Sequence, residues 1–598
     1  MFINNILRVF KLFIKTNVYA ILLPFKVTPI SYTFYCLLNI FKSAYPIVIV
    51  YIWSYMIDEM VILYYGAEVY TSILFLTLLY VGLLISSRIT RTGISMIHSY
   101  QKDKMQLYID TAVMNKMSAI DPALSDDPRN INKVDAALNS TIYVVDSAYW
   151  PIAAVSSVIS LIAAGVIFLS VDIFAGIIFL ATYIPGAVIT YINGKKMDQL
   201  SIETISETRE KEYYKKILTS IDFAKDIRLY GIKDNLIEKH NYLWKTIRLK
   251  RNIVFTKSFI LSCLALVLSY SGFLFIILRS AIAVYENSMM LGTMVMFIGL
   301  AHNVSSNLTQ IFIDFGIQIN VASQRIQYYM DFMAWKPSIY ENNGLCVTPF
   351  PEIRFENVSF RYPNSEKYTL KNISLTLKSK EKIALVGING AGKSTIVKLL
   401  LRFYDPEEGR ILLNGIDARE YSLSSLRSLF SVCFQSTFNY SLAIDENISL
   451  SSSSDEGMIM EAMQNADISS IFEDNDEGVK MPLTRKFEDN GLELSGGQWQ
   501  KIGVARTFYR DADIVILDEP SSALDPQAEE NVLNAFKRIC KEKSGLIISH
   551  RLSCLHMVDN IYVIENGVIA ESGSHGDLMT MGGRYAQLYN LQSSKYKI

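Results

Sequence analysis

Long apolar runs in the first 335 residues constrain this 598-residue chain more than any other feature. A helix that crosses a membrane needs roughly 20 mostly apolar residues, and six windows meet that need. They lie at about residues 30–57, 70–93, 141–170, 173–193, 254–279 and 289–315. In the remaining residues strand-like runs alternate with helical runs, as in a soluble α/β protein. The chain therefore divides into a membrane half and a soluble half.

Charges in the connections between these windows predict the topology. The connections at 58–70 and 280–288 contain no Lys or Arg, whereas those at 88–133 and 195–251 are rich in both. Under the positive-inside rule the two basic connections lie in the cytoplasm. We therefore expect both termini and the soluble half to be cytoplasmic.

The two basic connections are too long for turns and are predicted to extend the spanning helices. Each contains a candidate short crossing helix, "IDPALSDDPRN" at 120–130 and "TSIDFAKDIRLYGIKD" at 219–234. Either these helices dock against a cytoplasmic domain or they are exposed hairpin tips. Periodicity does not choose between the two.

Composition excludes several other classes of protein. The net charge of -1 argues against a strongly basic nucleic-acid binder. The six cysteines include no C-x-x-C pair, so reduced thiols are expected rather than a metal site or a disulfide framework. The N-terminal 26 residues mix apolar side chains with Arg8, Lys11 and Lys15, which is typical of an amphipathic interfacial helix.

The sixth window carries a polar face. Asn303, Asn307, Gln310, Asp314 and Gln318 recur at steps of four, three, four and four, so one side of a helix presents them all. In a bilayer such side chains face protein, water or a substrate path, and a cavity-lining role for the first four follows. The alternative is a helix that has already left the membrane, with a merely solvated polar face.

A phosphate-binding loop opens the soluble half. The stretch "KIALVGINGAGKSTIVKLLLRFY" reads as strand, loop and helix, and residues 387–394 match G-x-x-x-x-G-K-[ST]. The backbone from Gly387 through Asn389, Gly390, Ala391 and Gly392 to Thr395 is predicted to cradle phosphates. Lys393 neutralises charge on the β/γ-phosphates, and Ser394 ligates Mg²⁺.

An acidic pair follows a second apolar strand, in "ADIVILDEP". The run Ile514–Leu517 forms a buried strand that delivers Asp518 and Glu519 to its end. Asp518 suits the Mg²⁺ shell through water, and Glu519 suits a base toward an attacking water. Together with the phosphate loop, this pair predicts a hydrolytic site.

The order of the remaining motifs resembles the ATP-binding cassette (ABC) transporters. The segment "LSGGQ", Leu494–Gln498, lies shortly before the acidic strand, as the signature motif does in that family. The resemblance implies that Tyr362 in "FRYP" stacks on adenine and that Gln435 touches Mg²⁺. It further implies a D-loop at Ser522–Asp525, with Asp525 in the nucleotide site, and a γ-phosphate sensor at His550. Departures are modest: Trp499 stands where Arg is common, and Ser-Thr follows Gln435.

The resemblance covers nearly the whole chain and implies an exporter-type half-transporter. The expected fold is an α-helical membrane domain of six transmembrane helices (1–335), a linker (336–351) and an α/β P-loop NTPase nucleotide-binding domain with a helical signature subdomain (352–598). The two candidate crossing helices occupy coupling-helix positions. The implied catalytic residues are Glu519, His550 and Gln435.

The resemblance also implies a dimer, because each ATP lies between one subunit's phosphate loop and the other's signature segment. Ser495, Gly496, Gly497 and Gln498 would contact the partner's nucleotide, with ATP and Mg²⁺ as cofactors. A homodimer is favoured over a heterodimer, in a bacterial inner membrane and without a nucleic-acid partner. The expected function is ATP-driven export of an amphipathic small molecule, peptide or lipid. The alternatives are a membrane-anchored regulatory ATPase without vectorial transport, and an importer or channel.

Overall fold

The computed structural model describes residues 2–594 apart from short gaps. The gaps are 67–68, 122–127, 314–318, 338, 340–343, 350, 364, 436, 452–453, 472–477, 520–525 and 550–551. Two compact units emerge: one contains Met1–Ser118 and Asn132–Trp335, the other Ala119–Ile131 and Lys336–Ile598. The predicted domain bounds at 335 and 352 stay predictions.

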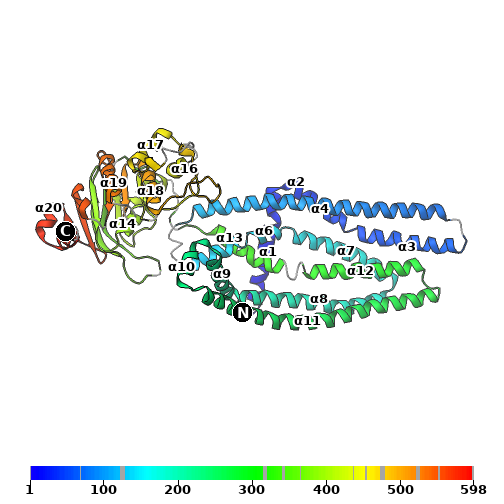
Figure 1. The fold of residues 1–598 in the computed structure, drawn as a ribbon. Coiled ribbons are helices and arrows are strands. Elements are labelled where there is room, and N and C mark those ends of the chain that lie inside the picture. The colour runs from blue at the N-terminus through cyan, green and yellow to red at the C-terminus, as the bar shows by residue number, and fades with distance from the viewer. Residues whose placement is uncertain are drawn as a thin grey trace. The chain divides into compact units, whose positions relative to one another are not determined.

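The first unit is entirely helical in its described part, with long helices running side by side (Figure 1). Its helices are α1 (Phe2–Val27), α2 (Pro29–Lys42), α3 (Tyr45–Tyr64), α4 (Tyr70–Ser118), α5 (Pro128–Leu138), α6 (Thr141–Asp146), α7 (Trp150–Val171), α8 (Ile173–Glu203), α9 (Ile205–Thr219), α10 (Ala224–Tyr230), α11 (Lys233–Tyr285), α12 (Leu291–Ile313) and α13 (Ile319–Ala334).

Five stretches in the described ranges are helical, long and apolar enough to cross a membrane. They are Pro29–Tyr64, Tyr70–Ser118, Lys133–Val171, Ile173–Ser201 and Lys233–Tyr285. They contain the first five predicted windows. The sixth window forms α12, a helix of 23 residues that is not among the five. A sixth span therefore stays a prediction.

Large apolar side chains hold α7, α8, α11 and α12 together. Phe168 of α7 stacks on Phe297 of α12 with ring centroids 4.6 Å apart, and its edge meets Phe179 of α8 at 5.5 Å. All three are almost fully buried. Helices α8 and α11 approach each other at Gly272 of α11, where an added Cβ would lie 2.0 Å from the Thr182 hydroxyl. A side chain at Gly272 would push α11 away from α8.

The predicted short helix at 219–234 is present. A 3₁₀ turn at Ile221–Phe223 leads into α10, and Gly231, with φ of 62°, ends it in the left-handed conformation that glycine favours. The other predicted crossing helix, at 120–130, lies mostly outside the described residues.

The second unit contains two sheets. Strands β1 (Ile353–Phe360), β2 (Leu370–Leu377), β4 (Glu408–Leu413) and β5 (Ile416–Asp417) form an antiparallel sheet in the order β2-β1-β4-β5. The larger sheet has the order β10-β9-β3-β8-β7-β6, and all its neighbours except β10 and β9 pair in parallel. Its strands are β3 (Lys382–Val386), β6 (Phe430–Cys433), β7 (Ile514–Asp518), β8 (Ser544–Ile548), β9 (Asn560–Glu565) and β10 (Val568–Gly573).

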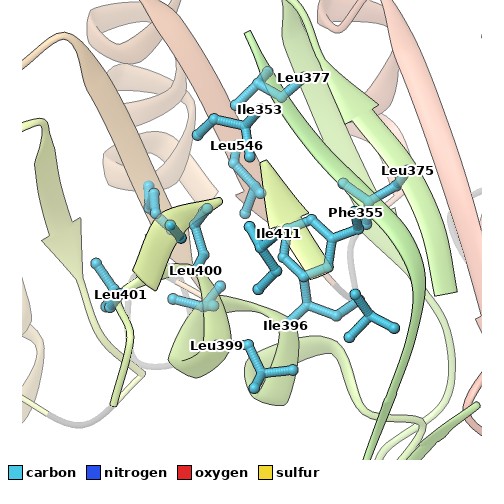
Figure 2. Close-up of a cluster of buried hydrophobic side chains, with 14 of the residues drawn as sticks. Ile353, Phe355, Leu375, Leu377, Ile396, Leu399, Leu400, Leu401, Ile411 and Leu546 are labelled. Carbon is cyan, nitrogen blue, oxygen red and sulfur yellow. The ribbon is translucent and has the colours of Figure 1, made fainter. Parts of the chain in front are cut away.

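Helix α14 (Lys393–Leu400) is fixed in an apolar core that both sheets share. Figure 2 shows Ile396 and Leu399 of α14 beside Phe355 and Ile411 of the antiparallel sheet and Leu546 of the larger one. All five are at most 4% exposed. Because this core immobilises α14, the loop that precedes the helix is positioned as well.

The second core, on the other face of the larger sheet, holds most of the remaining helices. They are α16 (Ile444–Ser449), α17 (Glu456–Asn465), α18 (Gly496–Tyr509), α19 (Pro526–Ile539), α20 (His575–Met581) and α21 (Arg584–Ser594). Helix α15 (Leu423–Ser428) packs in the first core instead. Trp499 of α18 is buried in this second core, at 5% exposed. The position where the sequence departs from the family is thus a packing position in this chain.

Candidate functional site

The predicted phosphate loop lies between β3 and α14, and two glycines allow its tight path. Gly392 has φ of 105°, and a Cβ there would lie 2.5 Å from Leu370 Cδ2. At Gly387 an added Cβ would meet the carbonyl oxygen of Ile564 at 2.2 Å. Neither position accepts a side chain without movement of β2 or β9. The packing therefore requires glycine where the motif has it.

Lys393 begins α14 and is 5% exposed. Its Nζ donates hydrogen bonds to the carbonyl oxygens of Gly387 at 2.9 Å and Ile388 at 3.1 Å. Burial lowers the pKa of the ammonium, while the nearby carboxylates of Glu519 and Asp518 act to raise it. The ammonium thus lies against the backbone of the phosphate loop, at the start of a helix.

Ser394 and Asp518 meet although 124 residues separate them. The Ser394 hydroxyl donates to Oδ1 of Asp518 at 3.3 Å. Asp518 is the last residue of β7 and only 4% exposed, and β8 lies between β7 and β3 in the sheet. The carboxyl ends of these parallel strands share one edge, and that edge brings the loop helix and the acidic strand together.

Glu519 follows directly in an unusual backbone conformation. Its φ is 50°, which is uncommon for a residue other than glycine and costs of order 1 kcal/mol or more. Hydrogen bonds from both its backbone and its side chain hold it there. Its N–H donates to the Ile548 carbonyl at 2.9 Å, its carbonyl accepts from Gln500 Nε2 at 3.2 Å, and its Oε2 accepts from Gln435 Nε2 at 2.8 Å.

Tyr362 contacts the helix that follows the phosphate loop. Its hydroxyl shares a hydrogen bond of 3.1 Å with the Thr395 hydroxyl, and Lys398 Nζ lies 5.0 Å from the ring centroid. The edge of the Tyr362 ring also meets Tyr404, at 5.4 Å. These contacts fix an aromatic ring beside the phosphate loop.

One cavity of about 420 Å³ collects these side chains. Its lining is formed by Tyr362, Thr369, Asn389, Gly390, Gly392, Lys393, Ser394, Thr395, Gln435 and Glu519. Nine of these ten residues were predicted from sequence motifs, and they come from four separate segments. Ala391 lies in the same loop but is buried beneath it.

The signature segment forms a capped helix start. Ser495 accepts from Gln498 N at 3.3 Å through its hydroxyl, and Gln498 Oε1 accepts from Ser495 N at 2.7 Å. This reciprocal capping box explains why a helix begins directly at a Gly-Gly pair. A Cβ added at Gly496 would have no heavy atom within 4 Å among the described residues. Packing against the described residues therefore does not require glycine at 496.

Several predicted residues lie elsewhere. Asp525 and His550, with the D-loop at 522–525, lie outside the described residues, as do Asp314 and Gln318. Asn307 Nδ2 donates to Ser160 Oγ of α7 at 3.0 Å and to Asn303 Oδ1 at 2.5 Å. Asn303 and Asn307 thus contact protein, while Gln310 is exposed. Their cavity-lining role stays a prediction.

A different face of α12 borders a cavity that the sequence analysis missed. This space of about 350 Å³ lies among α8, α11 and α12, and His302, Ser305 and Thr309 contribute to it. Spacing of three and four also links these residues, but hydroxyls and a lone histidine within an apolar helix are weaker signals than amides. Thr369 and Gln500 were likewise missed, because a lone Thr or Gln carries no motif.

Sequence comparisons point in the same direction as the geometry. Residues 370–522 match the family model described as ABC transporter. The chain is 29% identical to the subtilin transport ATP-binding protein SpaT of Bacillus subtilis over 567 residues, which is 90% of this chain and 88% of the relative. It is 40% identical to the ATP-dependent lipid A-core flippase of Escherichia coli K12 over 243 residues, but this match covers only 41% of the flippase.

A solved structure shows the fold across both halves. It is titled as a bacterial Atm1-family ABC exporter with ATP bound, and it superposes with a TM-score of 0.74 over 95% of this chain and 99% of its own, at 21% identity. The helical membrane unit, the cassette with its phosphate loop and the family match agree. The chain thus carries an ABC transporter domain fused to a helical multi-pass membrane unit, and it is homologous to ABC exporters.

Proposed function

We propose that this protein couples ATP hydrolysis to export of an amphipathic solute by alternating access of a dimer. The observation that carries the proposal is the 420 Å³ cavity, in which an aromatic ring, a phosphate loop with its lysine, an amide and a carboxylate converge. Each group suits one part of a nucleoside triphosphate. SpaT and the lipid A-core flippase, which resemble this chain, are named for transport of subtilin and of a lipid.

In this proposal Tyr362 stacks on the base, and loop N–H groups with Lys393 hold the phosphates. Glu519 takes a proton from the attacking water, and Gln435 positions the Glu519 carboxylate through the hydrogen bond of 2.8 Å. His550 and Asp525 complete the site as γ-phosphate sensor and D-loop residue. The strained backbone at Glu519 supports this assignment, since such strain clusters at active sites.

The donor set also fits Mg²⁺, which prefers oxygen ligands and retains several waters. The Ser394 hydroxyl and the Gln435 amide oxygen would hold the ion directly, and Asp518 through water. Ser394 Oγ already lies 3.3 Å from Asp518 Oδ1, so the two reach one position. When bound, the ion would neutralise charge on the phosphate oxygens.

The signature segment would complete the partner's site. Ser495, Gly496, Gly497 and Gln498 present a hydroxyl and backbone N–H groups at a helix N-terminus, which suits the γ-phosphate of an ATP held by a second subunit. The open space beside Gly496 supports this role, because none of the described residues fills that space. A homodimer is proposed, with hydrolysis at both sites, in the cytoplasmic membrane with the cassette in the cytoplasm.

Vectorial uptake into inside-out vesicles tests the proposal. ATP should drive accumulation of a solute first identified by its stimulation of ATPase activity in proteoliposomes. The Glu519→Gln variant should abolish both hydrolysis and uptake. Hydrolysis that no tested solute stimulates and that drives no uptake would support a membrane-anchored regulatory ATPase instead.

A further inference from the structure

A cavity of about 520 Å³ within the membrane unit lies between α2, α4 and the segment that joins α6 to α7. Lys42 of α2 and Arg91 of α4 both line it. The wall between them is aromatic: the Tyr149 ring lies 5.3 Å from Tyr35 and 4.3 Å from His98, edge-on to both. The cavity thus combines two cations with an aromatic cluster.

Both cations lie on helices long and apolar enough to cross a membrane, and Arg91 lies near the end of its predicted window at 70–93, where the basic connection begins. Lys42 belongs to the candidate span Pro29–Tyr64, and Arg91 to the helix Tyr70–Ser118. Exposed apolar side chains flank them on their own helices, among them Leu37, Ile89 and Met96. A charged residue in such a setting is costly, and a nearby anion normally offsets that cost.

The described part of the chain offers neither cation such an anion. Neither Lys42 nor Arg91 forms an ion pair or a side-chain hydrogen bond with any described residue. The one carboxylate among the lining residues is Asp146, and its Oδ1 already accepts a hydrogen bond from Lys102 Nζ at 2.7 Å. The lining therefore contains two cations and one carboxylate that Lys102 already pairs.

It also holds an unused hydrogen-bonding group. Tyr149 is 4% exposed, and its hydroxyl has no hydrogen-bond partner among the described residues. A buried hydroxyl without a partner costs roughly 1–3 kcal/mol, so such groups are usually satisfied. Two cations without ion pairs, in a cavity that Tyr149 with its unsatisfied hydroxyl also lines, together fit an oxyanion.

We propose that this cavity binds the anionic headgroup, a phosphate or a carboxylate, of an amphipathic molecule. Lys42 and Arg91 neutralise the headgroup, the Tyr149 side chain turns so that its buried hydroxyl donates a hydrogen bond to it, and Ile94 and Ala153 contact the start of the apolar tail. The inference rests on the proposed function and names the charge class of the solute. The same chemistry suits a membrane lipid that stays bound, and the experiment separates the two sources.

The test uses the full-length protein in phosphatidylcholine nanodiscs, with radiolabelled dodecyl phosphate as the probe. We expect saturable binding that dodecyl maltoside, which has the same tail and a neutral head, does not displace. Lys42→Gln and Arg91→Gln should each weaken binding about tenfold, since each loses a charge-assisted hydrogen bond. Lys42→Arg and Arg91→Lys should restore most of the affinity.

Arg88→Gln is the matched control, because Arg88 lies one turn away on α4 but outside the cavity. It should bind the probe like the unaltered protein. The inference fails if the unaltered protein binds no dodecyl phosphate, as when a carboxylate of the second subunit already neutralises the cations. It also fails if dodecyl maltoside competes equally or if both Gln variants bind normally.

Two further arms separate the sources of the anion. ATP-driven accumulation of dodecyl phosphate in inside-out vesicles, lost in Arg91→Gln, would identify a transported solute. Displacement of the probe by phosphatidic acid, without accumulation, would identify a bound lipid. ATPase activity is measured in the same samples: its absence contradicts the proposed function, whereas activity without anion binding contradicts only this inference.

Discussion

The Gln435 side chain donates a hydrogen bond from Nε2 to Oε2 of Glu519 over 2.8 Å. The two residues lie just beyond β6 and β7, which are parallel neighbours in the larger sheet. Since parallel strands end at the same edge, the two side chains meet although their positions in the sequence differ by 84. This pair links the segment after β6 to the proposed catalytic base.

Removing the Gln435 amide should slow turnover more than it weakens nucleotide binding. We expect Gln435→Ala to lower kcat about tenfold, because a hydrogen bond to a charged group is lost. In Gln435→Glu two carboxylates would share one place, so one of them would hold its proton to higher pH. The acidic limb of the pH–rate profile should then shift to higher pH. An unchanged profile in Gln435→Glu would contradict the contact.

Replacing Glu519 by Gln should stop hydrolysis while ATP still binds. The amide preserves size and can keep the contact with Gln435, but it cannot accept a proton, so we expect a loss of about 10²–10⁴-fold in kcat. The variant should retain ATP through gel filtration and elute as a closed dimer. Near-normal steady-state activity would remove Glu519 from the role of base.

Removing the Lys393 ammonium should weaken nucleotide binding itself. Lys393→Ala deletes the charge at the phosphate loop, and we expect affinity for a fluorescent ATP analogue to fall about tenfold or more. Lys371→Ala removes an exposed lysine from β2 of the same domain and should leave the titration unchanged. Equal affinities in both variants would count against Lys393 as a phosphate ligand.

Two glycines of α18 should respond differently to valine. Gly496 has open space around an added Cβ, so Gly496→Val should keep the melting temperature within a few degrees but abolish ATPase activity by blocking the partner's site. At Gly503 an added Cβ would lie 2.1 Å from Thr437 Cγ2, so Gly503→Val should lower the melting temperature. Normal activity in Gly496→Val would contradict the intersubunit role.

The buried thiols of the cassette should resist alkylation. Burial raises the pKa of Cys433 and of Cys540 to about 12, whereas Cys346 is exposed. Between pH 7 and pH 9, labelling of Cys346 should rise and that of the two buried thiols should not, as mass spectrometry of peptides can measure. In denaturant all three should react.

The sign of the pH effect on stability follows from the same thiols. Unfolded thiols ionise near pH 9, and the folded ones only near 12, so the cassette should lose stability as pH rises through this range. Stability that increases over this range, after allowance for surface lysines, would contradict the burial of the two thiols.

Local patterns in the sequence were sufficient for the phosphate loop, the acidic strand, the signature helix and the first five candidate spans. Each of these is contiguous, and each obeys a rule of spacing or composition that acts over about 20 residues or fewer. The family resemblance then supplied Tyr362 and Gln435, which carry too little local signal alone. The structure places both on the lining of the same cavity.

Contacts between distant residues required the folded chain. The positive φ of Glu519, the support from Gln500 and the open space at Gly496 depend on how β7, β8 and α18 pack. On α12 the polar periodicity identified a face but not its neighbour, and Asn303 and Asn307 contact Ser160. Lys42 and Arg91 line one cavity, although they lie on different helices and no sequence motif links them. Helical periodicity in a sequence predicts which residues share a face, whereas only the packing of the folded chain determines which residues that face contacts.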